Sequence, residues 1–104
     1  MVGNYKVITL CGSSRFKEDF ERINKELTLA GNIVISLGAW GHAGDVFSDK
    51  EKQMLDDIHK RKIDMADEIF VINKNGYIGE STKSEIQYAL EHNKKVCYME
   101  PLNT

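Results

Sequence analysis

YKVITLC, residues 5–11, is a short apolar run with β-branched side chains, and it stops at Gly12. Such a run is typical of a buried β-strand. The next residues, Gly12 to Arg15, combine a glycine, two hydroxyls and a guanidinium, and an apolar pattern of helical period follows them. A strand that turns into a helix is the first half of a βαβ unit. The stretch therefore predicts a parallel α/β fold whose first loop lies at the carboxyl end of a strand.

The rest of the chain continues this alternation of strands and helices. Its patterns predict helices at about 16–30, 48–66 and 82–92, and further strands at 32–37, 68–72 and 96–99. The second helix is expected to begin at a capping box, Ser48 with Glu51, and to bury a face carrying Leu55, Ile58, Lys62 and Met65. We expect a flavodoxin-like or Rossmann-like three-layer sandwich with a four-stranded parallel sheet in the order 2-1-3-4.

Composition limits the function classes. A chain of 104 residues with 41% hydrophobic and 29% charged residues is expected to fold as one domain, residues 1–104. A net charge of −2 gives no basic surface for a nucleic-acid polymer. There is neither a membrane-length apolar run nor a signal-peptide layout at the N-terminus, so we expect a cytoplasmic protein without a membrane partner. Cys11 and Cys97 are expected to be buried free thiols.

The first loop offers a site for a phosphate. Backbone N–H groups at a helix start, the hydroxyls of Ser13 and Ser14 and the guanidinium of Arg15 together suit an anion, and Gly12 permits close approach. The alternative is ordinary structure, in which one serine caps the helix and Arg15 is solvated.

The second loop, NKNGYIGESTKSE at residues 73–85, follows the third strand and contains two glycines. Thr82 and Glu85 have the spacing of a capping box, which would explain them without any chemistry. However, the loop supplies more hydroxyls than one cap needs, and Tyr77 lies between the glycines. A carboxylate here could instead attack the anomeric carbon of a nucleoside and hold the sugar as an ester. We therefore take Glu85 as a candidate nucleophile and Tyr77, Gly79, Ser81 and Thr82 as candidate substrate-binding residues.

Three segments together resemble the nucleoside 2-deoxyribosyltransferase superfamily: CGSSR at 11–15, ADEIFVIN at 66–73 and GESTKSEI at 79–86. The 2′-deoxynucleoside 5′-phosphate N-hydrolases are the more similar branch. The resemblance implies a nucleophilic glutamate at Glu85, phosphate contacts at Gly12, Ser13 and Arg15, a nucleoside or nucleotide ligand, and no cofactor. It also implies a homodimer or larger oligomer, since family members complete each site with residues of a neighbouring subunit after the fourth strand.

The chain departs from the family pattern at the supporting aspartate. The matching position in the helix before the third strand is His59, with Asp57 two residues earlier, so both are candidate catalytic residues. A surface ion pair with Arg61 is the alternative for Asp57. Only residues 100–104 follow the fourth strand, which favours hydrolysis over transfer to a second base.

Other readings stay open. CGSS with the later glycines and Thr82-x-x-Glu85 also resembles the Lonely-guy-type phosphoribohydrolases, and a nucleotide-binding protein without catalysis would use the same crevice. Trp40 is expected either to stack on a base or to fold back as a hydrophobic plug. A metal site built from His42, Asp45, Asp57 and His59 lacks tight ligand spacing, so the sequence predicts no structural metal.

Overall fold

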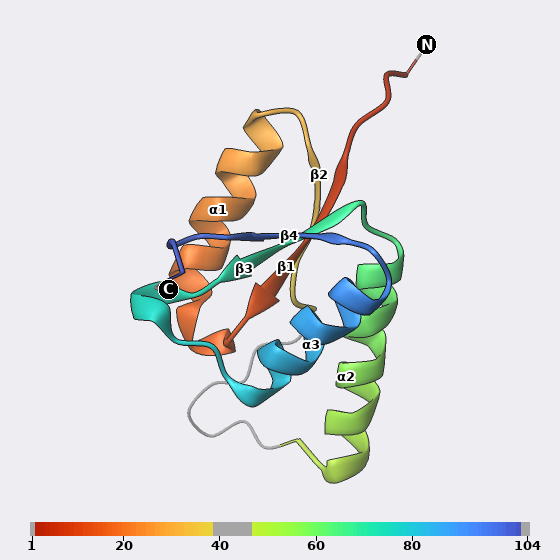
Figure 1. Ribbon diagram of the computed structural model, residues 1–104, viewed down its shortest axis with the longest axis vertical. Coiled ribbons are helices and arrows are strands. Elements are labelled where there is room, and N and C mark those ends of the chain that lie inside the picture. Colours follow the sequence, from red (N-terminus) through yellow and green to blue (C-terminus); the bar gives the residue numbers. More distant parts are fainter. Residues whose placement is uncertain (1, 39–46, 103–104) are drawn as a thin grey trace.

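The computed structural model describes residues 2–38 and 47–102, and Figure 1 shows their arrangement. The strands are β1 (Val7–Gly12), β2 (Ile33–Ile35), β3 (Glu68–Ile72) and β4 (Lys95–Tyr98), and the main helices are α1 (Lys17–Leu29), α2 (Asp49–Asp64) and α3 (Glu80–Glu91). Short 3₁₀ turns, η1 (Ser14–Phe16) and η2 (Lys74–Gly76), follow β1 and β3. Across the two described ranges, no helix has the length and apolar character that crossing a membrane requires.

The sheet has the expected topology. Its four strands are parallel and lie in the order β2-β1-β3-β4. The longest register joins β1 to β3, from Ile8 opposite Glu68 to Gly12 opposite Ile72. Because both strands end together, the loops that follow them lie at the same edge of the sheet, at the topological switch point where open α/β sheets bind ligands. The predicted α/β class and strand order are confirmed.

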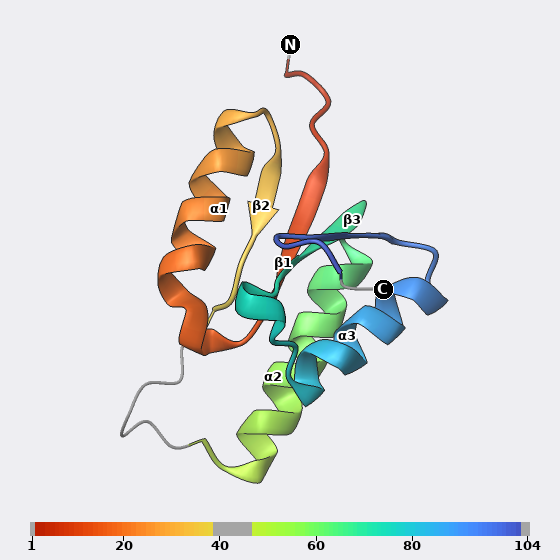
Figure 2. The same ribbon diagram turned by 60° about the vertical axis from the view of Figure 1, so that its left-hand side comes forward.

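Helices cover both faces of the sheet, with α1 on one side and α2 and α3 on the other (Figure 2). Alternate residues of β1 point to opposite faces, so Leu10 packs with Phe20 and Ile23 of α1, whereas Cys11 packs with Ile63 of α2 and Ala89 of α3. Both β1 and β3 are buried on both faces, which explains why each reads as a continuous apolar run.

Helix α2 begins as expected but buries a different face. Ser48 and Glu51 form the predicted capping box, with bonds of 2.9 and 3.1 Å. The predicted core face is wrong: Ile58 is 42% and Met65 61% exposed, and the helix buries His59 and Ile63 instead. A polar side chain in the middle of the buried face breaks the apolar pattern on which the prediction depended.

Hydrogen bonds hold the loop after β3 in place. The buried side chain of Asn73 donates to the carbonyl of Glu100 at 3.0 Å and accepts from its N–H at 2.8 Å. The Glu100 carboxylate in turn accepts from the N–H of Asn75 at 2.8 Å. These bonds attach the start of the loop to the chain beyond β4, so the glycine-containing segment that leads into α3 starts from a fixed point.

Gly12 is the tightest point of the fold near this edge. Its φ of 153° is one that side chains rarely allow, and a Cβ atom would lie 2.9 Å from the Ile72 carbonyl oxygen and 3.0 Å from the Ile72 Cβ atom. Gly31, after α1, also has a positive φ, of 99°, but a Cβ there would meet nothing within 4 Å. The two glycines therefore separate backbone strain from steric conflict.

Gly12→Ala is expected to lower the free energy of unfolding by about 2–5 kcal/mol, because it adds a backbone clash to an unfavourable φ. Gly31→Ala, with strain alone, should cost about 1–2 kcal/mol. Denaturant unfolding of both variants checks this. Equal losses of free energy in the two variants would show that β1 and β3 move apart at little cost, and that the short distance between Gly12 and Ile72 does not limit stability.

Candidate functional site

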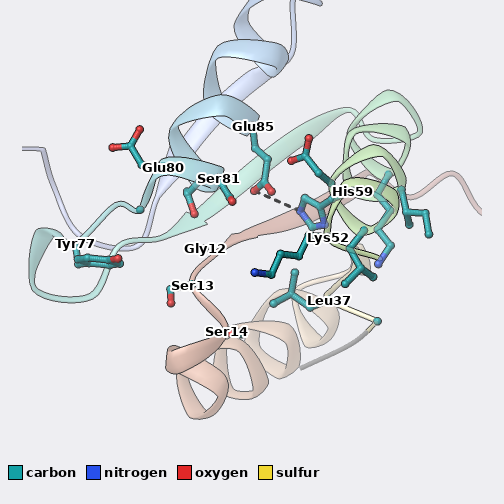
Figure 3. Close-up of a pocket in the computed structure, with 17 residues that line it drawn as sticks. Gly12, Ser13, Ser14, Leu37, Lys52, His59, Tyr77, Glu80, Ser81 and Glu85 are labelled. Carbon is teal, nitrogen blue, oxygen red and sulfur yellow. Dashed lines mark ion pairs between the residues drawn. The ribbon is translucent and has the colours of Figure 1, made fainter. Parts of the chain in front are cut away.

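A cavity of about 660 Å³ opens between the loops after β1 and β3 and the helices α2 and α3 (Figure 3). It brings together residues far apart in the sequence, including most of the predicted site. The residues that line it are Gly12, Ser13, Ser14, Leu37, Gly38, Lys52, Leu55, Asp56, Ile58, His59, Lys62, Tyr77, Gly79, Glu80, Ser81, Thr82 and Glu85. Its volume is within the range of small-molecule sites.

The start of α3 decides what Thr82 and Glu85 do. The helix begins at Glu80 with Gly79 as N-cap residue, two residues before the predicted start, and no side chain bonds the cap. Thr82 is therefore inside the first turn and Glu85 inside the second, so the capping-box interpretation of this pair is wrong. Glu85 is left without the structural role that its spacing suggested, and its side chain is buried at the cavity wall.

Glu85 lies beside His59 and Cys11 on the inner side of the cavity. His59 is 5%, Glu85 8% and Cys11 0% exposed, although all three carry polar or titratable side chains. His59 Nε2 is 3.8 Å from Glu85 Oε1, and Figure 3 shows the two side chains pointing toward each other from α2 and α3. Nε2 has no hydrogen-bond partner in the described part of the protein. A buried nitrogen without a partner is uncommon, and here it faces a buried carboxyl.

Contacts between the two helices fix this arrangement. The Tyr88 hydroxyl of α3 donates to the Asp64 carboxylate of α2 at 2.6 Å. Lys94, just after α3, donates to the carbonyls of Asp64 and Ala66 at 3.2 and 2.8 Å, which satisfies carbonyls at the end of α2. On the strand side, the Lys62 ammonium donates to the Ser36 carbonyl at 2.8 Å. The relative positions of His59 and Glu85 thus depend on packed helices rather than on a loop.

Burial favours the neutral forms of both groups. It raises the pKa of Glu85 from 4.5 to about 7, with the negative charge of Asp56 adding to the rise and the Cys11 thiol opposing it. Burial likewise lowers the pKa of His59 from 6.5 to about 4, helped by the positive charge of Lys62 and opposed by a backbone hydrogen bond to Leu10. A carboxyl with a pKa near 7 changes its charge in the neutral range, where a change of protonation is chemically useful.

The mouth of the cavity carries the polar groups predicted from the first loop. Ser13 accepts from the Arg15 N–H at 3.3 Å and so caps η1, the short turn that precedes α1, whereas α1 itself has Phe16 as N-cap residue and no side-chain cap. Ser14 lines the cavity. The Arg15 guanidinium is exposed and does not line the cavity; it lies 4.3 Å from the centre of the Tyr77 ring and 3.4 Å from its hydroxyl. Arg15 therefore reaches the site through Tyr77.

Two residues of α2 that the sequence did not single out, Lys52 and Asp56, line the cavity. Asp57 is exposed and outside the lining, whereas Asp56 lines the cavity and pairs with Lys60 at 3.2 Å. Lys52, which the sequence did not single out, directs its ammonium into the cavity (Figure 3). Helical spacing identifies both, since Lys52 and Asp56 lie seven and three residues before His59 and share its side of α2.

Of the other predicted residues, some line the cavity and some lie outside the described part of the chain. Gly12, Gly79, Ser81 and Thr82, all predicted substrate-binding residues, line the cavity. Trp40, His42 and Asp45 lie outside the described residues. Both cysteines are free thiols as expected, but only Cys11 is buried, whereas Cys97 is half-buried. Cys11 joins the buried group around Glu85, which its apolar surroundings in the sequence did not indicate. Among the described residues, Cys11, His59 and Glu85 have possible metal-ligand atoms within 4.8 Å of one another.

Comparison with known proteins adds no assignment: the sequence matches neither a protein-family model nor a curated protein.

The raised pKa of Glu85 has a consequence for stability. In the unfolded chain this carboxyl ionises near pH 4.5, but in the folded protein only near pH 7, so the folded state holds more protons in between. The free energy of unfolding of the parent protein should therefore fall, through Glu85, as the pH rises across this window. Glu85→Gln should escape this loss and gain roughly 3 kcal/mol over the parent between pH 4.5 and 8.

Urea unfolding of both proteins at several pH values measures the difference. Glu91→Gln is the matched control, because Glu91 is exposed on the same helix. His59 also lowers the free energy of unfolding as the pH falls from 6.5 toward 4. This change cancels in the difference between the two proteins when the pKa of His59 is the same in both. A constant difference between Glu85→Gln and the parent across the range would mean that Glu85 ionises normally.

Proposed function

We propose that this protein cleaves the N-glycosidic bond of a nucleoside 5′-monophosphate or (deoxy)nucleoside through a nucleophilic Glu85. One observation carries the proposal: a buried carboxyl that caps no helix forms the wall of a cavity whose mouth is a glycine–serine loop. The cavity joins an anion-binding feature to a possible nucleophile. A sugar phosphate has these two ends, a phosphate and an anomeric carbon.

The phosphate end is supported by the loop after β1. Gly12, Ser13 and Ser14 face the cavity, and Gly12 has no side chain to keep a ligand away from the backbone. The Lys52 ammonium enters the cavity from α2 and supplies a positive charge for a phosphate (Figure 3).

Tyr77, with Arg15 against its ring, forms another part of the lining. An aromatic ring at this place offers a surface on which a base can stack.

The chemistry follows from the neighbourhood of Glu85. In its ionised form the carboxylate bonds to the anomeric carbon as the C–N bond breaks, and the base leaves with the electron pair and takes a proton from solvent. Water then attacks the same carbon, the ester oxygen returns to Glu85 as the carboxylate, and the second proton of the water is released. The Glu85 carboxyl loses its proton to solvent as the pH passes about 7, because His59, with a pKa of about 4, is the weaker base. His59 Nε2, 3.8 Å from Oε1, is an uncharged neighbour of this carboxyl group.

This function agrees with the resemblance to the nucleoside 2-deoxyribosyltransferase superfamily, within which hydrolysis of a 5′-monophosphate is our preferred reaction. The strand order is compatible with a flavodoxin-like fold. The residue at the place of the family's supporting aspartate is His59, so the side chain that neighbours the glutamate is an imidazole here. Asp56, on the preceding turn of α2, supplies a carboxylate to the same cavity.

A nucleotide-binding protein without catalysis is the second candidate function. It is favoured by the closeness of His59 and Glu85, because a buried neutral pair can hydrogen-bond a base without reacting with the sugar. The two candidates differ in one respect that is simple to measure. A binding protein retains its nucleotide unchanged, and an N-glycosidase releases the base.

Incubation with a panel of nucleosides and 5′-monophosphates, followed by chromatography, is expected to show released base. Glu85→Gln should lower that rate by several powers of ten, because an amide attacks an anomeric carbon poorly, while the variant stays folded. Glu91→Gln, an exposed change on the same helix, should keep the parent rate. Absence of base release by the parent protein from every substrate, with nucleotide binding retained, would reject catalysis in favour of binding.

The phosphate end has its own test. We expect 5′-monophosphates to bind more tightly than the matching nucleosides, and Lys52→Ala to remove roughly 1.5–3 kcal/mol of that preference as a lost charge-assisted bond. Lys50→Ala is the control, since Lys50 is exposed on the same turn of α2 and does not line the cavity. Titration calorimetry compares the ligands. Equal affinity of the parent protein for nucleoside and monophosphate would refute phosphate recognition and leave Ser13 as a cap only.

A further inference from the structure

Cys11, His59 and Glu85 form a compact group of possible metal ligands. The Cys11 Sγ, one imidazole nitrogen of His59 and a carboxylate oxygen of Glu85 all lie within 4.8 Å of one another. The three residues come from β1, α2 and α3, so the packing of the sheet against both helices holds the group together. All three are more than nine-tenths buried. Nothing in the chemistry proposed above requires the thiol.

The imidazole of His59 is oriented as a ligand would be. The backbone of Leu10 acts on His59 as a hydrogen-bond acceptor, and Nε2 has no partner in the described ranges, so Nδ1 is the nitrogen available to donate to the Leu10 carbonyl. A carbonyl that accepts from Nδ1–H fixes the tautomer whose Nε2 carries a lone pair. Metal-binding histidines usually have this second contact, because it orients the ring. Figure 3 shows the His59 ring directed toward the Glu85 carboxyl group, with Nε2 3.8 Å from Oε1.

The donor set selects a class of ion. A thiolate, an imidazole and a carboxylate are the ligands that zinc(II) uses, and three protein ligands leave the fourth tetrahedral position open. A thiolate and a carboxylate also balance the charge of a divalent ion, which suits a buried site. The ligand atoms need to move closer by only about an ångström, since zinc bonds of about 2.0–2.3 Å place tetrahedral ligands nearer together than 4.8 Å.

We propose that Cys11, His59 and Glu85 bind zinc(II) or a similar thiophilic divalent ion, with the open position facing the cavity. His59 and Glu85 line the cavity, so the ion has a path to the site. Cys11, on β1, supplies the third ligand. On binding, the thiol loses its proton to solvent and the sulfur bonds to the ion.

Metal binding has a consequence that rests on the proposed function. A carboxylate that bonds to zinc shares its negative charge with the ion and is held against it, so Glu85 loses its nucleophilicity toward an anomeric carbon. Zinc is therefore an inhibitor of base release, and the protein is active in its metal-free form. Occupancy of the site would regulate the enzyme through the nucleophile itself.

Cobalt(II), a spectroscopic substitute for zinc, tests the site without any substrate. One equivalent should give a thiolate-to-cobalt charge-transfer band in the parent protein, and an added equivalent of zinc should remove it. Cys97→Ser is the decisive variant, because Cys11 is then the one thiol left in the chain. A band in Cys97→Ser assigns the ligand to Cys11, even if Cys11→Ser fails to fold. No band in either protein, or a band that persists in folded Cys11→Ser, overturns the proposal.

Affinity and activity complete the test. Loss of an outer-shell partner alone typically weakens a metal site 10–100-fold, so His59→Gln and Glu85→Gln should each bind zinc at least about 10-fold more weakly than the parent. Base release by the chelator-treated protein should disappear with one equivalent of zinc and return with chelator. Undiminished release from the zinc-bound protein overturns the inhibitory role. A cobalt band without base release in any metal state would instead reject the proposed function and leave the metal site intact.

Discussion

The pairing of β1 with β3 is the constraint on which the rest of the structure depends. Five residue pairs align the two strands from Ile8 and Glu68 to Gly12 and Ile72, so that both end at one edge of the sheet. The alignment requires glycine at position 12, where a Cβ would lie 2.9 Å from the Ile72 carbonyl oxygen. The same pairing determines where the loop after β1 meets the loop that leads into α3, and the cavity lies between them.

Burial is the second organising effect, because it removes water from groups that normally keep it. Cys11, His59 and Glu85 occupy a place that three apolar residues would fill at less cost in free energy. Burial lowers the pKa of His59 and raises that of Glu85, so that each is held near its neutral form. Both the proposed glycosidic chemistry and the proposed zinc site use this arrangement. The two uses exclude one another, because a Glu85 carboxylate that is bound to zinc is withdrawn from attack on a sugar.

Much of the fold was predictable from apolar periodicity and glycine positions, which identified the strands, the strand order and the loops that line the cavity. The errors occurred where polar side chains are buried. His59 interrupts the apolar face of α2, and the prediction therefore moved that face to Ile58 and Met65, which are exposed. The Thr82 and Glu85 spacing imitates a capping box, but Gly79 begins the helix. Local patterns mislead most often at candidate functional sites, because such sites break the rules that stabilise ordinary elements.

In the proposed reaction, Glu85 forms a covalent bond with a sugar. Fluorine at C2 of a nucleoside 5′-monophosphate destabilises the oxocarbenium-like transition states of both steps. A good leaving base still allows the ester to form, but hydrolysis of the ester becomes slow, so the ester should accumulate. Mass spectrometry of the trypsin-digested protein then examines the peptide of residues 84–94. We expect a mass increase of one fluoropentosyl phosphate, located on Glu85 by fragmentation. Release of the base with an unmodified Glu85, or with the sugar attached to another residue, would contradict it.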